Sequence, residues 1–240
     1  MNLGTIWLAA GGASAWFAEF TRTFEKCFIR EDRYTWLLDG IGVTIKISLL
    51  AAVLGLLVGF LIAICSLSKS KLLRFFGKVY TDVIRGTPSV TQLMIIYFVV
   101  FASVHWEKWI IAAIAFSINS GAYVAEIVRS GIMSIDKGQF EAGRSLGFNY
   151  AQTMIYIIMP QAFKNVLPAL GNEFIVLLKE TSVSGYIALQ DLTKGGDIIR
   201  SRTYNAFMPL LAVAVIYLIL VMVFTQLVNA LERRLRNSDH

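Results

Sequence analysis

The sequence predicts an all-α protein, a polytopic transmembrane helical bundle with five core spans. Hydrophobic residues make up 56% of the chain and charged residues only 16%, and the mean hydropathy is +0.63. A soluble domain carries about 25% charged residues, so this deficit indicates a chain that lies in lipid. The net charge of +6 comes from Lys and Arg beside apolar runs. That placement is typical of membrane proteins and not of a nucleic-acid-binding patch.

The predicted spans follow from uncharged stretches long enough to cross a bilayer, which takes about 20 residues. Between Ile41 and Leu67 the only charge is Lys46, and Gly55 and Gly59 form a small-xxx-small pair that lets a second helix approach. The alternative is two incidental glycines on a lipid-facing helix. We place the five spans at about 37–67, 80–105, 108–131, 152–180 and 204–232.

The fourth span is interrupted. Pro160, Lys164, Pro168 and Glu173 break its apolar run. The alternation of sides along the chain nevertheless needs a crossing there, and interrupted helices are tolerated where they line a cavity or pack inside protein. We therefore count this segment as a span.

Residues 1–35 form a separate N-terminal segment, predicted to be extracytoplasmic. Phenylalanines recur in it at helical spacing, with the charged residues largely off the stripe: Phe17, Phe20, Phe24 and Phe28. This pattern predicts an amphipathic helix that lies on the outer membrane interface. A sixth span is the alternative, which the eight charges between Glu19 and Arg33 oppose.

Basic residues in short loops predict the orientation of the chain. The stretch from Ser68 to Lys78 carries four basic residues and no acid, and three arginines follow the last span. Alternation of the spans places both clusters on one side, which we expect to be cytoplasmic. The N-terminus and the stretch 181–205 are then outside, and the C-terminus, with a short tail at 237–240, is cytoplasmic.

One stretch on the predicted cytoplasmic side carries a motif. Glu141, Ala142 and Gly143 are followed by three residues and Gly147, then by nine residues and Ile-Ile-Met-Pro at 157–160. This arrangement resembles the signature of ABC importer permeases, which reads Glu-Ala-Ala, three residues, Gly, nine residues, Ile-x-Leu-Pro. The departures are Gly for the second Ala and Met for Leu. A helix with so little side-chain bulk can seat in a groove on a partner, and Gly147 permits a sharp turn after it.

The resemblance implies a role for this stretch. In the family it is the coupling helix, here at about 138–150, which docks on a separate ATP-binding subunit. The expected coupling residues are Glu141, Ala142, Gly143 and Gly147. The alternative is a capped cytoplasmic loop that has no partner.

Further matches narrow the family. Arg-Gly-Thr-Pro at 85–88 and the stretches 119–129, 167–174 and 178–182 resemble the polar-amino-acid uptake branch of these permeases. The resemblance covers about residues 36–236. It implies an importer in the cytoplasmic membrane of a prokaryote, with two permease chains, two ATP-binding subunits and an extracytoplasmic solute-binding protein. We expect a homodimer of permeases, with a heterodimer as the alternative, and ATP and Mg on the ATP-binding subunits with no cofactor or metal on this chain.

Polar residues at membrane depth need a partner or a cavity, because a charge at the bilayer centre costs about 2.5–3.5 kcal/mol on insertion scales. Asn119 falls at the middle of the third span, with Tyr123 and Glu126 on the same face. Arg85 has a depth similar to that of Glu126, which predicts an Arg85–Glu126 ion pair. The candidates for a substrate pathway are Asn119, Ser120, Tyr123, Gln161, Asn165, Asn172, Glu173 and Asp197. Structural contacts between helices are the alternative.

Two of these candidates are acidic and lie toward the outer half. Glu173 and Asp197 would supply a counter-charge to a cationic substrate. For a neutral substrate, we expect Glu173 to pair with Lys179 or Lys46. The sequence does not decide between these cases.

The chain lacks the patterns of an enzyme. Its histidines, His105 and His240, make no metal-ligand spacing, and neither Gly-x-Ser-x-Gly nor Gly-x-x-x-x-Gly-Lys-[Ser/Thr] occurs. ATP hydrolysis is therefore expected on a partner chain. The residues and the resemblance together predict the pore-forming subunit of an ATP-driven importer for polar amino acids. The alternatives are a permease of the same type for another small polar solute, or a secondary transporter.

Overall fold

Every regular element in the computed structural model, which describes residues 12–236, is a helix. The predicted all-α class is confirmed for this range. The first eleven residues and the predicted tail at 237–240 lie outside the described residues. The elements are α2 (Gly12–Phe24), η1 (Glu25–Ile29), η2 (Arg30–Asp32), α3 (Tyr34–Leu67), α4 (Lys71–Arg85), α5 (Ser89–Ile95), η3 (Ile96–Val100), α6 (Lys108–Met133), α7 (Lys137–Ser145), α8 (Tyr150–Thr153), η4 (Met154–Ile158), α9 (Met159–Glu180), η5 (Thr181–Ile187), α10 (Leu192–Thr203) and α11 (Phe207–Arg236).

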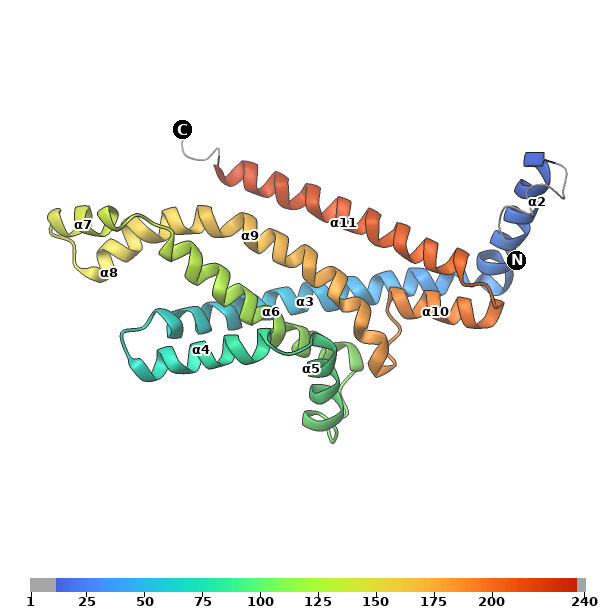
Figure 1. The fold of residues 1–240 in the computed structure, drawn as a ribbon, viewed down its shortest axis with the longest axis horizontal. Coiled ribbons are helices and arrows are strands. Elements are labelled where there is room, and N and C mark those ends of the chain that lie inside the picture. Colours follow the sequence, from blue (N-terminus) through green and yellow to red (C-terminus); the bar gives the residue numbers. More distant parts are fainter. Residues whose placement is uncertain (1–11, 237–240) are drawn as a thin grey trace.

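The four long helices lie roughly along one common axis. Figure 1 shows α3, α6, α9 and α11 running along the long axis of the molecule, with α7 and α8 at one end and α10 and α2 at the other. The helices α3 and α6 lie in close contact, because a Cβ added at Gly59 would clash with Val124, and one at Gly55 would lie 3.3 Å from the Cβ of Ser120. The close approach predicted from the two glycines is confirmed.

Membrane-crossing length and hydropathy are met by three helices among the described residues, namely α3, α6 and α11. The pair formed by α4 and the α5–η3 segment makes a fourth if its two bent halves are one span. The helix α9 has 22 residues, so it is roughly 33 Å long at about 1.5 Å per residue. It is not among the apolar candidates, and it carries charged residues and Pro168. The count of five spans stays a prediction.

The second span differs from the prediction. We expected a helix over about 80–105, whereas α4 starts at Lys71 and ends at Arg85, and the chain then bends by 104° into Ser89–Val100. Pro88 lacks a backbone N–H and disfavours helical geometry at Thr87, which explains a break at this point. The residues after the break lie across the bundle instead of continuing along it (Figure 1).

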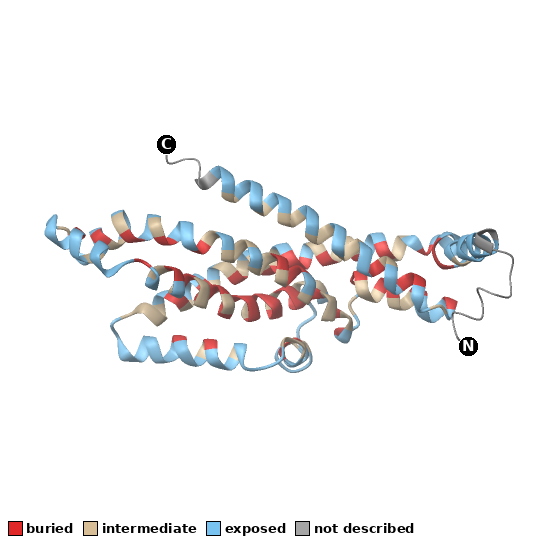
Figure 2. Ribbon diagram, turned by 45° about the horizontal axis from the view of Figure 1, so that its top comes forward, coloured by how far each residue is buried: buried red, intermediate tan, exposed pale blue. Residues whose placement is uncertain are grey.

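Burial is concentrated on α6. Of its most apolar 18-residue window, 67% is buried, against 17% for α11. Figure 2 shows the same contrast as a band of buried residues through the centre and an exposed α11. The largest fully buried side chain is Phe116 on α6, and it packs with Ile47 of α3, Leu93 of α5 and Leu177 of α9. The helix α6 is therefore the hub around which the other helices are placed.

Candidate functional site

The coupling segment forms a short helix with a defined start. Asp136 caps α7, and its carboxylate accepts a hydrogen bond from the backbone N–H of Gly138 at 2.6 Å. Such caps satisfy backbone donors that have no partner within the helix. Glu141 and Ala142 are exposed on α7, whereas Gly143 is buried. The exposed pair presents a small surface on which a partner can sit.

The end of α7 is equally well defined. Gly147 has a φ of +82°, its N–H donates to Arg144 O at 3.0 Å, and the N–H of Phe148 donates to Gly143 O at 3.0 Å. These two bonds make a Schellman motif, in which glycine takes the left-handed position. Asn149 and Gln152 then form a reciprocal capping box that starts α8. The chain therefore turns at Gly147 as the sequence predicts.

Gly143 is required by close packing. A Cβ at this position would lie 2.6 Å from Cγ2 and 2.8 Å from Oγ1 of Thr153, and 3.0 Å from Cδ1 of Ile157. These neighbours come from α8 and η4, so α7 is pressed onto the chain that leads into α9. The family signature has Ala at this position, and the close contact with Thr153 and Ile157 explains why this chain has Gly instead.

A pocket of about 370 Å³ lies beside α7. Its wall carries two cations, Lys69 and Arg144, and the Lys69 ammonium lies 5.2 Å from the centre of the Tyr150 ring. Thr153 also lines it, and its buried hydroxyl has no hydrogen-bond partner among the described residues. The surroundings of the coupling segment are therefore basic and polar.

Two predicted pathway residues on α9 contact the coupling end. The Gln161 amide donates to Ile157 O at 2.8 Å and to Gln139 Oε1 at 3.3 Å. The Asn165 amide donates to the Ser134 hydroxyl at 3.0 Å. The bond to Gln139 joins α9 to α7 itself, and the bond to Ser134 joins α9 to the residues just before α7. The geometry thus gives these two residues the structural contacts that were the alternative to a substrate role.

A polar pair lies in the middle of the bundle. The Asn119 amide, on α6, donates to Gln92 Oε1 on α5 at 2.8 Å, and both side chains are buried. The amide of Gln92 donates to Ile84 O at 2.7 Å and to Thr87 Oγ1 at 2.6 Å. Gln92 therefore bridges the bend between α4 and α5 and holds it against α6. Gln92 was not among the residues predicted from the sequence, although its position four residues after Pro88 was a usable signal.

A second polar pair joins α6 to α9. The Ser120 hydroxyl donates to Glu173 Oε1 at 2.8 Å. Glu173 is half-buried, and among the described residues it forms no ion pair with Lys179 or Lys46, the partners we expected for a neutral substrate. Because Ser120 follows Asn119, the two pairs are neighbours on α6. We call Gln92, Asn119, Ser120 and Glu173 the polar layer.

The predicted ion pair between Arg85 and Glu126 does not form. Glu126 instead binds Arg129 on its own helix, with Arg129 Nη2 at 2.5 Å from Glu126 Oε1. The Arg85 guanidinium lies over the Tyr123 ring, 5.2 Å from its centre. An arginine three residues along the same helix has a shorter reach to the carboxylate than one on another helix. Tyr123 is therefore placed by a cation–π contact with α4.

The last two candidates lie apart from the polar layer. Asn172 is exposed on α9. Asp197 lies on α10, where Lys194 Nζ contacts its Oδ2 at 2.9 Å and Arg200 Nη2 its Oδ1 at 2.5 Å. Hydrogen bonds from Lys194 and Arg200 hold the pKa of Asp197 below its usual value. Asp197 is thus a paired carboxylate at the end of the bundle away from α7.

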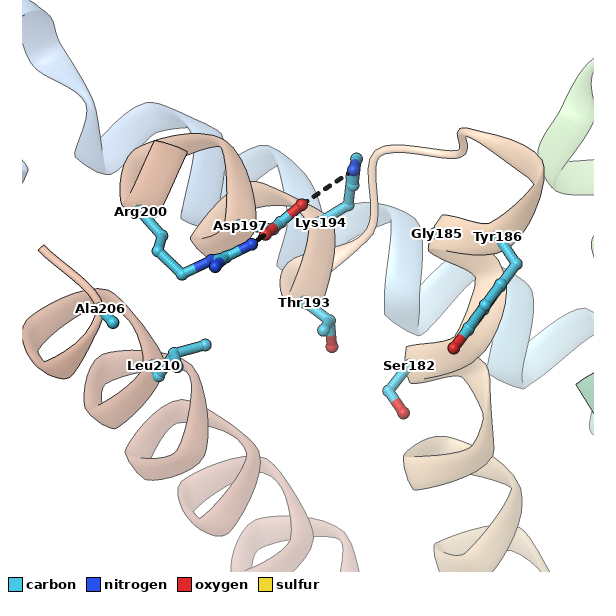
Figure 3. A pocket seen from close by; sticks show the side chains of 9 residues that line it. All are labelled: Ser182, Gly185, Tyr186, Thr193, Lys194, Asp197, Arg200, Ala206 and Leu210. Atoms are coloured by element: carbon cyan, nitrogen blue, oxygen red, sulfur yellow. Dashed lines mark hydrogen bonds and ion pairs between the residues drawn. The ribbon is translucent and has the colours of Figure 1, made fainter. Parts of the chain in front are cut away.

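Asp197 lines a pocket of about 520 Å³ between η5, α10 and the start of α11. Figure 3 shows Ser182 and Tyr186 across the pocket from Ala206 and Leu210, with the charged cluster on the α10 wall. The complete lining is Ser182, Gly185, Tyr186, Thr193, Lys194, Asp197, Arg200, Ala206 and Leu210. Its volume and its mixture of charged, hydroxyl and apolar groups suit a small polar molecule.

A buried carboxylate lies next to this pocket, at the junction between η5 and α10. Asp191 is fully buried, and its Oδ1 accepts a hydrogen bond from the backbone N–H of Lys194 at 2.8 Å. Its Oδ2 and the buried Ser184 Oγ lack a hydrogen-bond partner among the described residues. Burial raises the pKa of Asp191 to about 6. Gly40 of α3 packs against the same junction, since a Cβ there would be 2.7 Å from Asp191 O.

The sequence profile of a family described as binding-protein-dependent transport system inner membrane component matches residues 55–237. That range contains the polar layer, the coupling segment and α11. The chain belongs to this family. The predicted resemblance to ABC importer permeases is thereby confirmed, and with it the expectation of a multi-pass membrane permease.

Full-length relatives of this permease carry amino acid transport names. A putative glutamine transport system permease protein GlnP of Rickettsia bellii is 39% identical and aligns over 88% of this chain and 98% of its own. The arginine transport system permease protein ArtQ of Bacillus subtilis is 39% identical over 85% of this chain and 94% of its own. The glutamine transport system permease protein GlnP of Escherichia coli is 37% identical over 83% and 93%.

Solved structures agree with the sequence relatives. A chain in the crystal structure of an amino acid ABC transporter with histidines has a TM-score of 0.79 and 42% identity, and covers 86% of this chain and 98% of its own. A chain of the MetNI methionine ABC transporter, in an inward-facing conformation, has a TM-score of 0.70 at 19% identity. The second likeness concerns the fold alone. The permease fold is thus shared over most of the chain.

Proposed function

We propose that this chain is the membrane-spanning subunit of an ATP-driven importer for polar amino acids. The observation that carries the proposal is the coupling segment: a capped helix that exposes Glu141 and Ala142 and packs through Gly143 against α8 and η4, which lead directly into α9. A helix fixed in this way passes a push from a docked partner into the bundle as a rigid body. The amino acid substrate is supported by relatives named for glutamine and arginine transport.

The proposal assigns ATP and Mg to a separate ATP-binding subunit. Two copies of that subunit, a second permease chain and an extracytoplasmic solute-binding protein complete the importer, with a homodimer of permeases as the simplest arrangement. The basic pocket beside α7, with Lys69 and Arg144 on its wall, fits an acidic side chain of the ATP-binding subunit. The positive-inside rule supports a cytoplasmic α7 and C-terminus and an outer N-terminus in the cytoplasmic membrane.

The proposed route of the substrate runs from the outer pocket to the polar layer. The charged and hydroxyl groups around Asp197 receive the amino acid after its release from the solute-binding protein. The polar layer then offers two amides, a hydroxyl and a carboxylate on three different helices. An amino acid carries both hydrogen-bonding partners and charge, so it can replace these side-chain contacts one for one. Glu173 is the group that would favour a cationic side chain.

The proposal is tested in proteoliposomes that contain the complete importer. We expect Glu141→Lys to remove the stimulation of ATP hydrolysis by the solute-binding protein and to weaken co-purification of the ATP-binding subunit. Glu141→Gln is the matched control, since it keeps the size of the side chain and changes only its charge, and it should retain most of the stimulation. Full stimulation in Glu141→Lys would remove this segment from the coupling mechanism.

A further inference from the structure

The helix α2 carries an aromatic stripe that the bundle leaves uncovered. Trp16 is 50% exposed, Phe17 61%, Phe20 39% and Phe24 43%. The rings contact one another along the stripe, with the centres of Trp16 and Phe20 5.4 Å apart. By its spacing, the exposed Arg22 lies on the opposite side of the helix, and the exposed Glu19 lies beside the stripe. Four aromatic side chains gathered on one face of a soluble surface helix would be unusual, so this face has a binding partner.

The stripe is attached to the bundle by residues 25–33, which connect α2 to α3 and which we call the elbow. Phe28, one turn beyond Phe24, is 5% exposed and Cys27 is fully buried, and both pack with Leu192 and Ile199 of α10. Arg33 donates a hydrogen bond to Lys26 O at 2.7 Å and so ties the end of this segment to the start of α3. The aromatic face is therefore held at a set position relative to the outer end of the bundle.

Backbone geometry in the elbow sets the direction of α2. Glu31 and Asp32 have positive φ values of 55° and 49°, a conformation that residues other than glycine rarely adopt. Glu31 is retained there by an ion pair with Arg33 at 2.9 Å. The chain turns sharply at these two residues, so α2 does not continue the line of α3. In Figure 1, α2 lies across the long axis of the bundle.

The position of α2 coincides with one rim of the membrane-facing surface. It lies at the end where α3 and α11 begin (Figure 1). Near those starts, Leu38 of α3 is 58% exposed and Phe207 of α11 is 68% exposed. Both helices have the length and hydropathy of membrane spans. Exposed apolar side chains of both candidate spans therefore lie at the same end of the bundle as α2.

We propose that α2 is an interfacial anchor whose aromatic stripe is immersed in the outer leaflet of the phospholipid bilayer. The continuous helical stretch of α2 and η1 has 13 and 5 residues, 18 in all, so it is at most roughly 27 Å long at about 1.5 Å per residue, shorter than a bilayer core of about 30 Å. Aromatic rings prefer the membrane–water interface, and a helix lying in that plane buries its apolar face about 5–10 Å deep. The anchor precedes the family match, which starts at residue 55, and the proposal does not depend on what the permease transports.

The depth of α2 can be measured with spin labels in the assembled importer. The parent variant carries Cys65→Ala, and its label uptake measures any reaction at the buried Cys27. Phe20→Cys places a label on the stripe, and Arg22→Cys places the matched control on the opposite face of the same helix. Power saturation with oxygen and with a water-soluble nickel chelate is recorded in nanodiscs of phosphatidylcholine, and again with phosphatidylglycerol added.

We expect the label at residue 20 to collide with oxygen and not with the nickel chelate, at a depth of about 5–10 Å below the phosphates. The label at residue 22 should collide freely with the nickel chelate. The depth should not change with phosphatidylglycerol, because Glu19 and Arg22 offset each other. If both labels meet the nickel chelate, α2 projects into water. If the label at residue 20 is shielded from both reagents, another protein surface covers the stripe. Either result would overturn the proposal.

Discussion

The coupling end and the polar layer are held together by different means. At the coupling end, local features of the helix termini and close packing fix α7: an Asp136 side-chain cap, a Schellman turn at Gly147 and a contact at Gly143 that leaves no room for a side chain. In the polar layer, hydrogen bonds between side chains join separate helices, such as Ser120 to Glu173. Backbone motifs suit a part that must move without deforming. Side-chain bonds suit a part whose partners a substrate can replace.

The sharpest way to break the coupling end is to add one methyl group. Gly143→Ala puts a Cβ 2.6 Å from Thr153 Cγ2, and overpacking of this kind costs about 1–3 kcal/mol. We expect lower thermal stability and a loss of stimulated ATP hydrolysis. Thr153→Ala removes the clashing atoms and an unpartnered hydroxyl, so the double variant should recover both properties. Independent, additive effects of the two substitutions would contradict this packing account.

The junction between η5 and α10, which contains Asp191, is a third region, and its contribution to the free energy of unfolding should depend on pH. Burial raises the pKa of Asp191 from 3.8 to about 6, so the neutral acid is favoured in the folded chain. Its stabilising effect is complete below about pH 4 and is lost as the pH rises through about 6. From about pH 4.5 to about pH 8, we expect the free energy of unfolding to fall about 2 kcal/mol further in the unsubstituted protein than in Asp191→Asn.

Thermal unfolding of purified protein at the two pH values measures this difference. Asp197→Asn is the control, because the pKa of Asp197 is lowered and its stabilising effect is lost only as the pH falls through that lowered value. Parallel pH dependence of the unsubstituted protein and Asp191→Asn would show that Asp191 is ionised without cost.

The polar layer can be tested through selectivity. Glu173→Gln keeps an oxygen that accepts the Ser120 hydrogen bond and removes the negative charge. We expect the uptake of a cationic amino acid, relative to a neutral one, to fall about tenfold, which corresponds to about 1.4 kcal/mol. Ser120→Ala is the control, since it breaks the same bond and keeps the charge. An unchanged ratio in Glu173→Gln would place Glu173 outside the pathway.

The coupling end could be predicted from sequence because its structure is local. Gly147 and the spacing around it specify a turn between two neighbouring helices, and small residues at Gly55 and Gly59 specify close contact whichever helix is the neighbour. In both cases the backbone needs a glycine, and a glycine is visible in the sequence. Composition and the length of the uncharged stretches predicted the helical class and the approximate positions of the long apolar helices α3, α6 and α11.

The polar layer could not be predicted because it depends on which helices meet. Arg85 and Glu126 have similar depth, yet Glu126 finds Arg129 on its own helix and Arg85 lies over Tyr123. Gln92 lies in an uncharged stretch, and its role appears only once the bend places α5 against α6. Gln161 was a candidate for the substrate pathway, although its side-chain partner is Gln139 in α7. Spacing along one helix does not identify partners on another.

The proposed coupling requires α7 to lie inside the cell and to be covered by the ATP-binding subunit. Glu141→Cys, in a variant with Cys65→Ala, places a thiol on the exposed face of α7, where a membrane-impermeant maleimide can report it. We predict labelling in inside-out vesicles, no labelling of intact cells, and protection when the ATP-binding subunit is added. Labelling of intact cells, or equal labelling with and without the ATP-binding subunit, would contradict the proposed coupling.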